Sequence, residues 1–418
     1  MKTRSKDQLT AQLKSSMKGQ PGPNQIMKNG VRRRSFIKGL GVAGAALFPA
    51  GTLLVNNANA MPNDDGGGKL SKGDASILRF LATAEIIESD FWQQYWELGE
   101  GTLASDFASF DPSTGMQPTA TGGNAAYRSA LQILDMDMPQ YVLDNTDDEF
   151  AHANFLRAYL ISKGANTSDI DMLFGPHFRT LQGSTATGVD KTKIGKRLTN
   201  LTQLTIDTSF WGLYRTDDAN PDLGGTGFAQ AVPSLAVGQH TAIPRTDADT
   251  MNADLIKAIA FTAGFHFPFI EIHGTSLYPQ LAQRVKDPEV LRVVLSIGPT
   301  EAMHFQTWQD KAGNATPVTA SNPDPVTFVD LTASTDEHLQ ANLIMPEPCP
   351  FLSKSLPKCS IVRPTATKGA AQAAVDTLTA NGLFIGQTQE FMQLLQDLAS
   401  DADAARRGQG QQGQQGQG

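Results

Sequence analysis

Two tetrapeptides, Glu149-Phe-Ala-His152 and Glu301-Ala-Met-His304, decide how this sequence is interpreted. The chain has seven histidines and eleven glutamates among 418 residues. Chance alone predicts about 0.2 Glu-x-x-His pairs in a chain of this composition. Residues three apart on a helix share a face, so a carboxylate and an imidazole at this spacing can bind one ion, with the carboxylate free to bridge to a second. Two such pairs therefore indicate a metal site built in two halves.

The two pairs lie in the second and fourth of four long helical patterns. Apolar residues recur at helical spacing in these patterns, and the fourth opens with an aspartate followed by proline, a typical helix start. The expected helices span about Lys72–Leu98, Thr146–Lys163, Asn252–Val285 and Asp287–Lys311. Two helices, a long connection and two more helices are typical of a four-helix bundle with one long crossover.

The first and third patterns each supply one more carboxylate. Glu85 lies on an apolar stripe, and Glu271 is the only acidic residue between Asp254 and Asp287. A buried charge costs several kcal/mol unless it is paired or bound to a metal. We therefore expect four carboxylates and two imidazoles to converge on two divalent ions. The expected ligands are Glu85, Glu149, His152, Glu271, Glu301 and His304. A set of oxygen and nitrogen donors without sulfur suits iron or manganese.

This set resembles the six-ligand pattern of the ferritin-like di-iron superfamily. The surrounding sequence is similar to the ferritin-like family that includes desiccation-related proteins, in Ala84–Phe91, in Glu271…Thr275…Tyr278 and in Gly188–Thr205. The resemblance covers about residues 70–310. It implies an all-α chain: a ferritin-like four-helix bundle with one long crossover insertion, extra C-terminal helices and irregular segments. It also implies two bound iron or manganese ions, with iron favoured.

Two functions stay open at this point. In the first, the chain uses its metals on dioxygen, on peroxide or on iron itself; manganese catalase, in the same superfamily, has a closely similar ligand arrangement. In the second, the chain is a non-enzymatic stress or desiccation-related scaffold with a structural or vestigial metal site. Long irregular insertions and a low-complexity tail favour the second function over a compact catalyst.

The other histidines and one more glutamate are interpreted as supporting residues. Glu88 is expected to face solvent or to support a ligand. His273 lies two residues from Glu271, on another face of the helix, and is expected to be structural. His266 is expected to be a hydrogen-bonded core histidine, with a role in lining a cavity as the alternative. The loop histidines are His177, His240 and His338.

The first 60 residues resemble a twin-arginine export signal. Arg33-Arg34-Ser-Phe-Ile-Lys38 precedes a weakly apolar run, Gly39–Val55, and Ala58-Asn-Ala60 has the small-x-small pattern that signal peptidases cut. An uncleaved signal anchor is the alternative. We expect a periplasmic or secreted protein, exported in the folded state, without a stable membrane span after cleavage.

The rest of the chain is divided by composition. Residues 61–70 form a linker, 71–311 the bundle, 312–406 a Pro-rich extension with C-terminal helices, and 407–418 a disordered Gly/Gln tail. An insertion at about 164–251 interrupts the bundle.

Further elements are expected within the insertion and the extension. One helix is predicted over Lys191–Tyr214, and a strand or two around Val326–Leu331. Two more helices are predicted over about Lys368–Ala380 and Gln387–Ala405.

Charge and cysteine content exclude several classes of protein. The net charge of −8 and the pI of about 5.4 argue against a nucleic-acid partner. Two cysteines, Cys349 and Cys359, are too few for a disulfide scaffold or a sulfur-ligated cluster; they form one disulfide or remain thiols. The ligand set and the resemblance imply metal ions as partners, together with dioxygen or peroxide. The oligomeric state is open, a homodimer included.

Overall fold

The computed structural model describes residues 69–101, 107–225, 227–340, 344–365 and 368–406. The export signal, most of the linker and the Gly/Gln tail that the sequence predicts lie outside the described residues. The chain divides into two units, and the second, Gly68–Gly418, holds every element discussed below.

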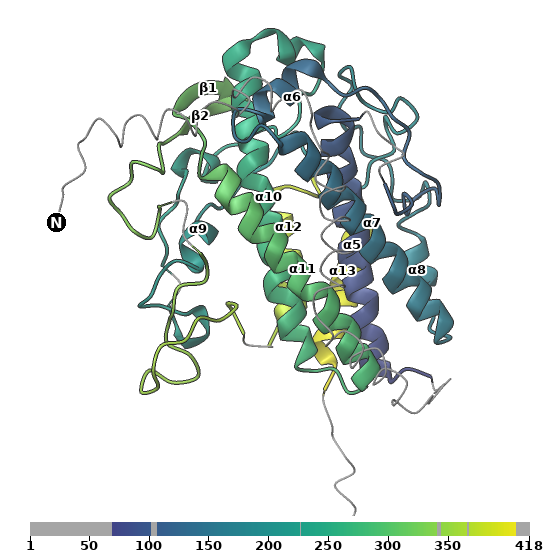
Figure 1. Ribbon diagram of the computed structural model, residues 1–418. Coiled ribbons are helices and arrows are strands. Elements are labelled where there is room, and N and C mark those ends of the chain that lie inside the picture. Colours follow the sequence, from purple (N-terminus) through teal and green to yellow (C-terminus); the bar gives the residue numbers. More distant parts are fainter. Residues whose placement is uncertain (1–68, 102–106, 226, 341–343, 366–367, 407–418) are drawn as a thin grey trace, which may run out of the picture. The chain divides into compact units, whose positions relative to one another are not determined.

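The second unit is mostly helical, and four long helices form its centre (Figure 1). They are α5 (Lys72–Gly99), α7 (Met138–Ser162), α10 (Ala253–Ala282) and α11 (Pro288–Ala312). Helix α5 packs against α7, and α10 packs against α11, so the long helices are arranged as two pairs joined by a long connection. The expectation of a mostly helical chain is confirmed.

Three of the long helices begin at a side chain that caps the first turn. Ser71, Asn252 and Asp287 each accept hydrogen bonds from backbone N–H groups that have no partner inside the helix. Helix α7 starts at Met138 and not at the predicted Thr146, so its first turns were missed. Proline at the second position of α7 suits this earlier start.

Helix α10 is the most apolar of the four long helices. By length and hydropathy it could cross a bilayer, but 89% of its most apolar window is buried inside the protein, as in the core helix of a globular protein. Pro268 and Pro279 lie within α10, and Pro299 lies within α11; both helices continue through them. These prolines therefore break neither helix of the second pair.

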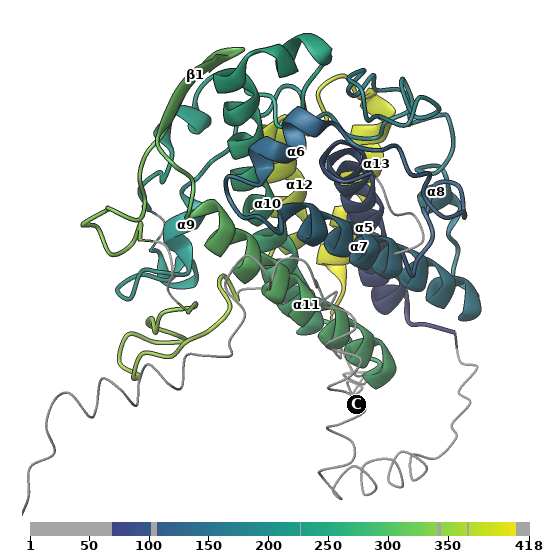
Figure 2. The same ribbon diagram turned by 45° about the horizontal axis from the view of Figure 1, so that its top comes forward.

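Two C-terminal helices cover the first and third long helices. Helix α12 (Ala370–Asn381) packs on α10, α13 (Gln389–Ala404) packs on α5, and the two contact each other. In Figure 2 both lie behind the four long helices. The sequence indicated both helices without indicating where they pack.

The remaining regular elements pack mainly against α10. Helix α6 (Ala125–Leu131) was not expected. Strands β1 (Val318–Asn322) and β2 (Asp324–Phe328) form an antiparallel hairpin, which contacts α10. Strand β2 overlaps the predicted strand around Val326–Leu331 but ends earlier.

The connection between α7 and α10 lacks a predicted helix. Within Lys191–Tyr214, only α9 (Phe210–Leu213) is helical, so that prediction was wrong. The segment is rich in threonine, a β-branched residue whose hydroxyl can also compete with helical hydrogen bonding. Thr202, for example, donates both its backbone N–H and its hydroxyl to the Asn200 side chain. The other short elements are α8 (Ser168–Asp171) and the 3-10 turns Pro221–Leu223, Pro233–Ala236 and Asp247–Met251.

Two buried carboxylates of α5 fasten this connection to the bundle. Asp90 accepts hydrogen bonds from Arg179 (2.7 Å) and from the backbone N–H groups of Leu198 (3.0 Å) and Thr199 (2.9 Å). Glu97 pairs with Arg197 in a second buried ion pair. The backbone N–H groups of Leu198 and Thr199 lie outside helices and sheets, and the Asp90 carboxylate provides the hydrogen-bond acceptor that secondary structure would otherwise provide.

Cys349 and Cys359 are free thiols in the structure. Their backbones are paired by two hydrogen bonds, of 3.1 Å from Cys349 N and 2.9 Å from Cys359 N. Cys349 is buried, whereas Cys359 is exposed.

We predict that Asp90→Ala lowers the free energy of unfolding by about 3–5 kcal/mol, because it leaves a buried arginine and two backbone N–H groups without their acceptor. Asp217→Ala is the control: it breaks an exposed pair with Lys358 and should cost less than about 1 kcal/mol. Urea unfolding followed by circular dichroism measures both values. Equal losses in the two variants would contradict the anchoring role.

Candidate metal centre

The six residues singled out from the sequence meet between the two helix pairs. Their four carboxylate side chains are at most 2% exposed, and the two imidazole side chains are 11% and 12% exposed. Helix α5 contributes Glu85, α7 contributes Glu149 and His152, α10 contributes Glu271, and α11 contributes Glu301 and His304. Each of the four long helices therefore supplies one carboxylate, and the second helix of each pair also supplies a histidine.

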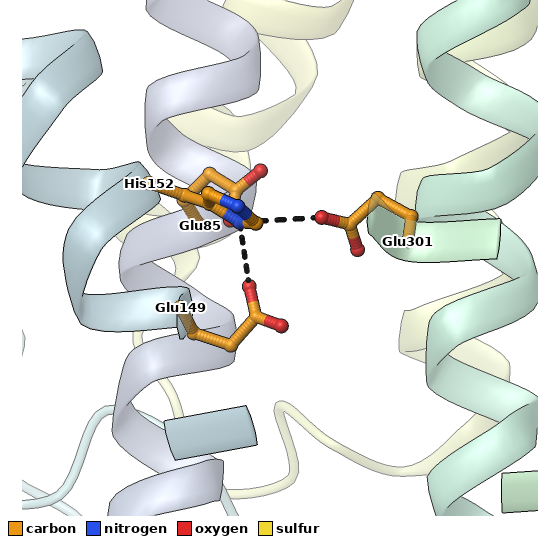
Figure 3. Close-up of side chains that lie close together, drawn as sticks. All are labelled: Glu85, Glu149, His152 and Glu301. Atoms are coloured by element: carbon orange, nitrogen blue, oxygen red, sulfur yellow. Dashed lines mark hydrogen bonds and ion pairs between the residues drawn. The ribbon is translucent and has the colours of Figure 1, made fainter. Parts of the chain in front are cut away.

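One half of the cluster consists of Glu85, Glu149, His152 and Glu301, whose donor atoms all lie within 4.8 Å of one another. His152 Nδ1 lies 3.3 Å from Glu85 Oε2, 3.3 Å from Glu149 Oε2 and 3.2 Å from Glu301 Oε1. In Figure 3, Glu301 of α11 points across toward His152 of α7. One N–H cannot satisfy three carboxylates, so this group offers more acceptors than the protein supplies donors.

The other half consists of Glu149, Glu271, Glu301 and His304, under the same 4.8 Å limit. His304 Nδ1 lies 3.3 Å from Glu149 Oε1 and 3.2 Å from Glu271 Oε2. Glu149 thus faces one histidine with each of its two oxygens, and Glu149 and Glu301 belong to both halves. The histidine rings are 6.4 Å apart between centroids.

Three oxygens of the cluster accept no hydrogen bond from the described residues: Glu85 Oε2 and both oxygens of Glu301. Glu85 Oε2 and Glu301 Oε1 lie only at ion-pair distance from the single His152 Nδ1, and Glu301 Oε2 faces no donor among these residues. A buried acceptor without a partner costs about 1–3 kcal/mol, and more when it is charged. Gly274 leaves room for the Glu301 carboxylate, because a Cβ atom added at position 274 would lie 2.5 Å from Glu301 Oε2. Carboxylate oxygens that converge without accepting hydrogen bonds are suited to bind divalent cations, which would satisfy all three atoms at once.

The crowding of carboxylates changes the proton affinity of the cluster. Burial raises the pKa of Glu271 well above its ordinary value, nearby Glu149 and Glu301 raise it further, and His304 opposes them. Burial would lower the pKa of both histidines, but the adjacent carboxylates outweigh it, and the pKa of each lies well above its usual range. In the absence of cations, protons therefore offset part of the repulsion.

Asn145 holds two of the carboxylates in place. Its Nδ2 donates to Glu149 Oε1 (2.8 Å) and to Glu271 Oε1 (3.1 Å), and its Oδ1 accepts from Trp308 Nε1 (2.6 Å). The Trp308 ring stacks on Trp92 at 5.2 Å between centroids. The acceptor bond to Trp308 fixes the amide orientation, so both N–H groups of Asn145 point at the cluster.

Three other side chains orient the cluster from outside. The Tyr278 hydroxyl donates to Glu85 Oε1. His152 Nε2 lies 3.2 Å from the Thr300 hydroxyl, and His304 Nε2 lies 3.1 Å from Asp148 Oδ2. The inner nitrogen of each histidine thus faces the carboxylates while the outer one is held by a partner, as in many metal sites.

Sequence reasoning missed most of these supporting residues. Asn145 and Asp148 each lie four residues before a predicted ligand, so helical spacing could have suggested them. Tyr278 belonged to the segment that resembles the ferritin-like family but had no assigned role. Glu88 is only 7% exposed, so the expectation that it faces solvent was wrong and its alternative, support of the ligands, fits. Its pKa is raised by burial and by the charges of Glu149 and Glu301.

The other histidines lie outside the cluster. His266 is a buried core histidine, as expected, with its ring nitrogens near the Tyr95 hydroxyl (2.7 Å) and Asn381 Oδ1 (3.3 Å). His273 Nδ1 donates to the Phe269 carbonyl at 2.6 Å. A third group of potential metal donors, which the sequence did not suggest, is exposed and consists of Asp217, Asp218 and His338.

Comparisons of the chain with protein-family models, with curated proteins and with solved structures found no match. Membership of the ferritin-like superfamily therefore stays a prediction from the motif residues.

We predict that the metal-free protein loses stability as pH rises. The raised pKa of Glu271 makes this loss begin above about pH 4.3, and the raised pKa of His152 and His304 adds to it above about pH 6.5. The folded state binds more protons than the unfolded state there, so the slope approaches about 1.4 kcal/mol per pH unit for each extra proton.

Urea unfolding of chelator-treated protein between pH 5 and 9 measures this slope. His152→Gln/His304→Gln should make it shallower above about pH 6.5, since two of the titrating groups are gone and the buried carboxylates remain. His177→Gln, at an exposed pair with Glu390, should leave it unchanged. If the free energy of unfolding of the wild type rises between pH 5 and 9, the cluster does not bind extra protons in the folded state, and the prediction is wrong.

Proposed function

We propose that this chain is an exported di-metal carboxylate protein, in which a ferritin-like four-helix bundle holds two iron or manganese ions for oxygen, peroxide or iron chemistry. Iron is favoured. The observation that carries the proposal is the sharing of Glu149 and Glu301 between two overlapping groups, each with its own carboxylate and its own histidine. An ion in either group would be held by three carboxylates and one imidazole, with Glu149 and Glu301 available to both ions.

The assignment of residues follows from this sharing. Glu85 and His152 would serve one ion, Glu271 and His304 the other, and Glu149 and Glu301 both. Iron or manganese bound there would supply one-electron redox chemistry between the +2 and +3 states. The absence of sulfur from the donor set agrees with these hard or borderline metals.

The chain's own residues would position these ligands and move protons. Asn145 and Tyr278 hold carboxylate oxygens through donated hydrogen bonds, and burial together with Glu85 raises the pKa of the Tyr278 hydroxyl, so its proton stays in place. His152 and His304 carry protons when no cation is present and would release them as cations bind. Metal uptake is therefore expected to release protons and to be tighter at higher pH.

Export by the twin-arginine route is part of the proposal. It rests on Arg33-Arg34-Ser-Phe-Ile-Lys38 and the small-residue cleavage pattern at Ala58–Ala60. A route that carries folded proteins would allow the centre to be loaded with a chosen metal before the protein reaches the periplasm or the outside.

We predict about two iron or manganese ions per mature wild-type chain, and different losses in matched single variants. Glu301→Gln removes a ligand of both ions and should bring the metal content close to zero. Glu271→Gln removes a ligand of one ion and should leave about one. Mass spectrometry of metals on protein exported through its native route measures the content.

Glu289→Gln is the control for these variants, because it changes a carboxylate of α11 that pairs with Lys163 at the surface. It should keep the wild-type content. The Glu301→Gln variant should still fold, since it removes a buried negative charge. A wild-type chain without metal would overturn the proposal. Metal content without any reaction with peroxide, dioxygen or ferrous iron would favour the scaffold function.

We also predict that Gly274→Ala lowers metal affinity by about 10-fold or more, because the added Cβ displaces the Glu301 carboxylate. Gly264→Ala is a matched control in the same buried helix, where the added Cβ would meet Leu134 Cδ1 at 2.6 Å, away from the cluster. It should lower stability and leave metal affinity unchanged. Competition with a chelating dye measures affinity, and equal effects of the two variants on it would contradict this role of Gly274.

A further inference from the structure

A cavity of about 580 Å³ lies between α9, α10 and α12, outside the metal centre. Its walls are mainly apolar, and Phe210, Phe228, Phe269 and Ile272 contribute to them. Cavities of about 300–1,000 Å³ with apolar walls and a few polar groups are typical of sites for small molecules. No function assigned above uses this space.

A second, much smaller cavity lies between this region and the carboxylate cluster. It measures about 30 Å³, enough for one water molecule, and lies among α5, α10, α12 and α13. His273, Leu277 and Ala374 line both cavities. Glu85, a member of the carboxylate cluster, and Glu88 line the small cavity. The large cavity is therefore separated from a space beside the cluster only by the wall that the two cavities share.

His273 provides a polar atom in this shared wall. Its Nδ1 faces the Phe269 carbonyl, which can only accept, so Nδ1 carries the hydrogen. In the neutral imidazole, Nε2 then presents a lone pair, and the described residues provide it with no hydrogen-bond donor. Two other polar side chains at the cavity are already used: Ser276 donates to the Arg363 carbonyl (2.7 Å) and Gln280 to the Pro364 carbonyl (3.2 Å).

We propose that the large cavity binds a small, uncharged, mainly apolar organic molecule whose single hydroxyl or amino group donates to His273 Nε2. The apolar walls select the body of the molecule, and the imidazole selects the donor. Bound in this way, its polar end lies at the wall shared with the small cavity that Glu85 and Glu88 line. The binding site stands by itself, whereas the further step, that this molecule is a substrate of the centre, rests on the proposed function.

Fluorescence titration of the full metal-free chain with 1-aminoanthracene tests the binding site, because this neutral aromatic amine is apolar and carries one donor group. We expect saturable binding at one site. Ala373→Trp, at an exposed position of α12 that lines the cavity, should weaken it at least 10-fold. Thr379→Trp is exposed on the same helix and lines neither cavity, so its binding should equal that of the wild type.

The role of His273 is tested by competition between two probes of similar size. 1-Naphthol should displace 1-aminoanthracene several-fold more effectively than naphthalene does, because only naphthol can donate to Nε2. The preference should vanish in His273→Phe. Unsaturable probe binding, or wild-type binding by Ala373→Trp, overturns the site; an unchanged preference in His273→Phe overturns the assignment of its polar end.

Cobalt-loaded protein tests the connection to the metal centre. Paramagnetic Co²⁺ should speed the relaxation of 1-naphthol protons in nuclear magnetic resonance relative to the same protein loaded with diamagnetic Zn²⁺. Bound cobalt without faster relaxation overturns the substrate role. A chain that binds 1-aminoanthracene but no metal overturns the proposed function alone, so the two failures are distinguishable.

Discussion

The burial of four carboxylates at one place between two helix pairs is the constraint on which the rest of this molecule depends. Four like charges in an apolar interior would drive the helices apart unless cations, protons or hydrogen bonds offset the repulsion. The protein itself provides protons, which the two imidazoles bind, and hydrogen bonds, which Asn145 and Tyr278 donate. Glu85 Oε2 and both oxygens of Glu301 accept no hydrogen bond from the described part of the chain, so these three atoms are left to bind cations.

The packing around the cluster restricts the movement of its members. Trp308 and Trp92 stack beside it, and Trp308 fixes the amide of Asn145, so two carboxylates are oriented by a rigid aromatic pair. Helices α12 and α13 cover α10 and α5 on the outer side, which makes the centre of the unit several layers thick. The two histidines are the slightly exposed members of the cluster, so the cluster is nearest to solvent on the side of α7 and α11.

The sequence predicted the parts of this arrangement that repeat with a helical period. Glu149 and His152 could be recognised by their spacing, and Glu271 by its isolation among apolar residues. Helical spacing could place Asn145 on the face of Glu149, but not show how its amide is oriented, because that depends on a tryptophan far away in the chain that only packing brings near. The predicted helix over Lys191–Tyr214 was wrong for a related reason: its apolar residues have helical spacing, but its backbone finds partners on α5.

Helix α5 carries both Glu85, in the cluster, and Asp90, which binds the backbone of the long connection. Long segments without regular structure usually open first, at a small fraction of the free energy of global unfolding. Here the amides of Leu198 and Thr199 are bonded to one of the most deeply buried helices, only a turn or two from the cluster. Opening this part of the connection would deprive the buried Asp90 carboxylate of its hydrogen-bond donors, so we expect the irregular segment and the charged interior to open as one cooperative unit.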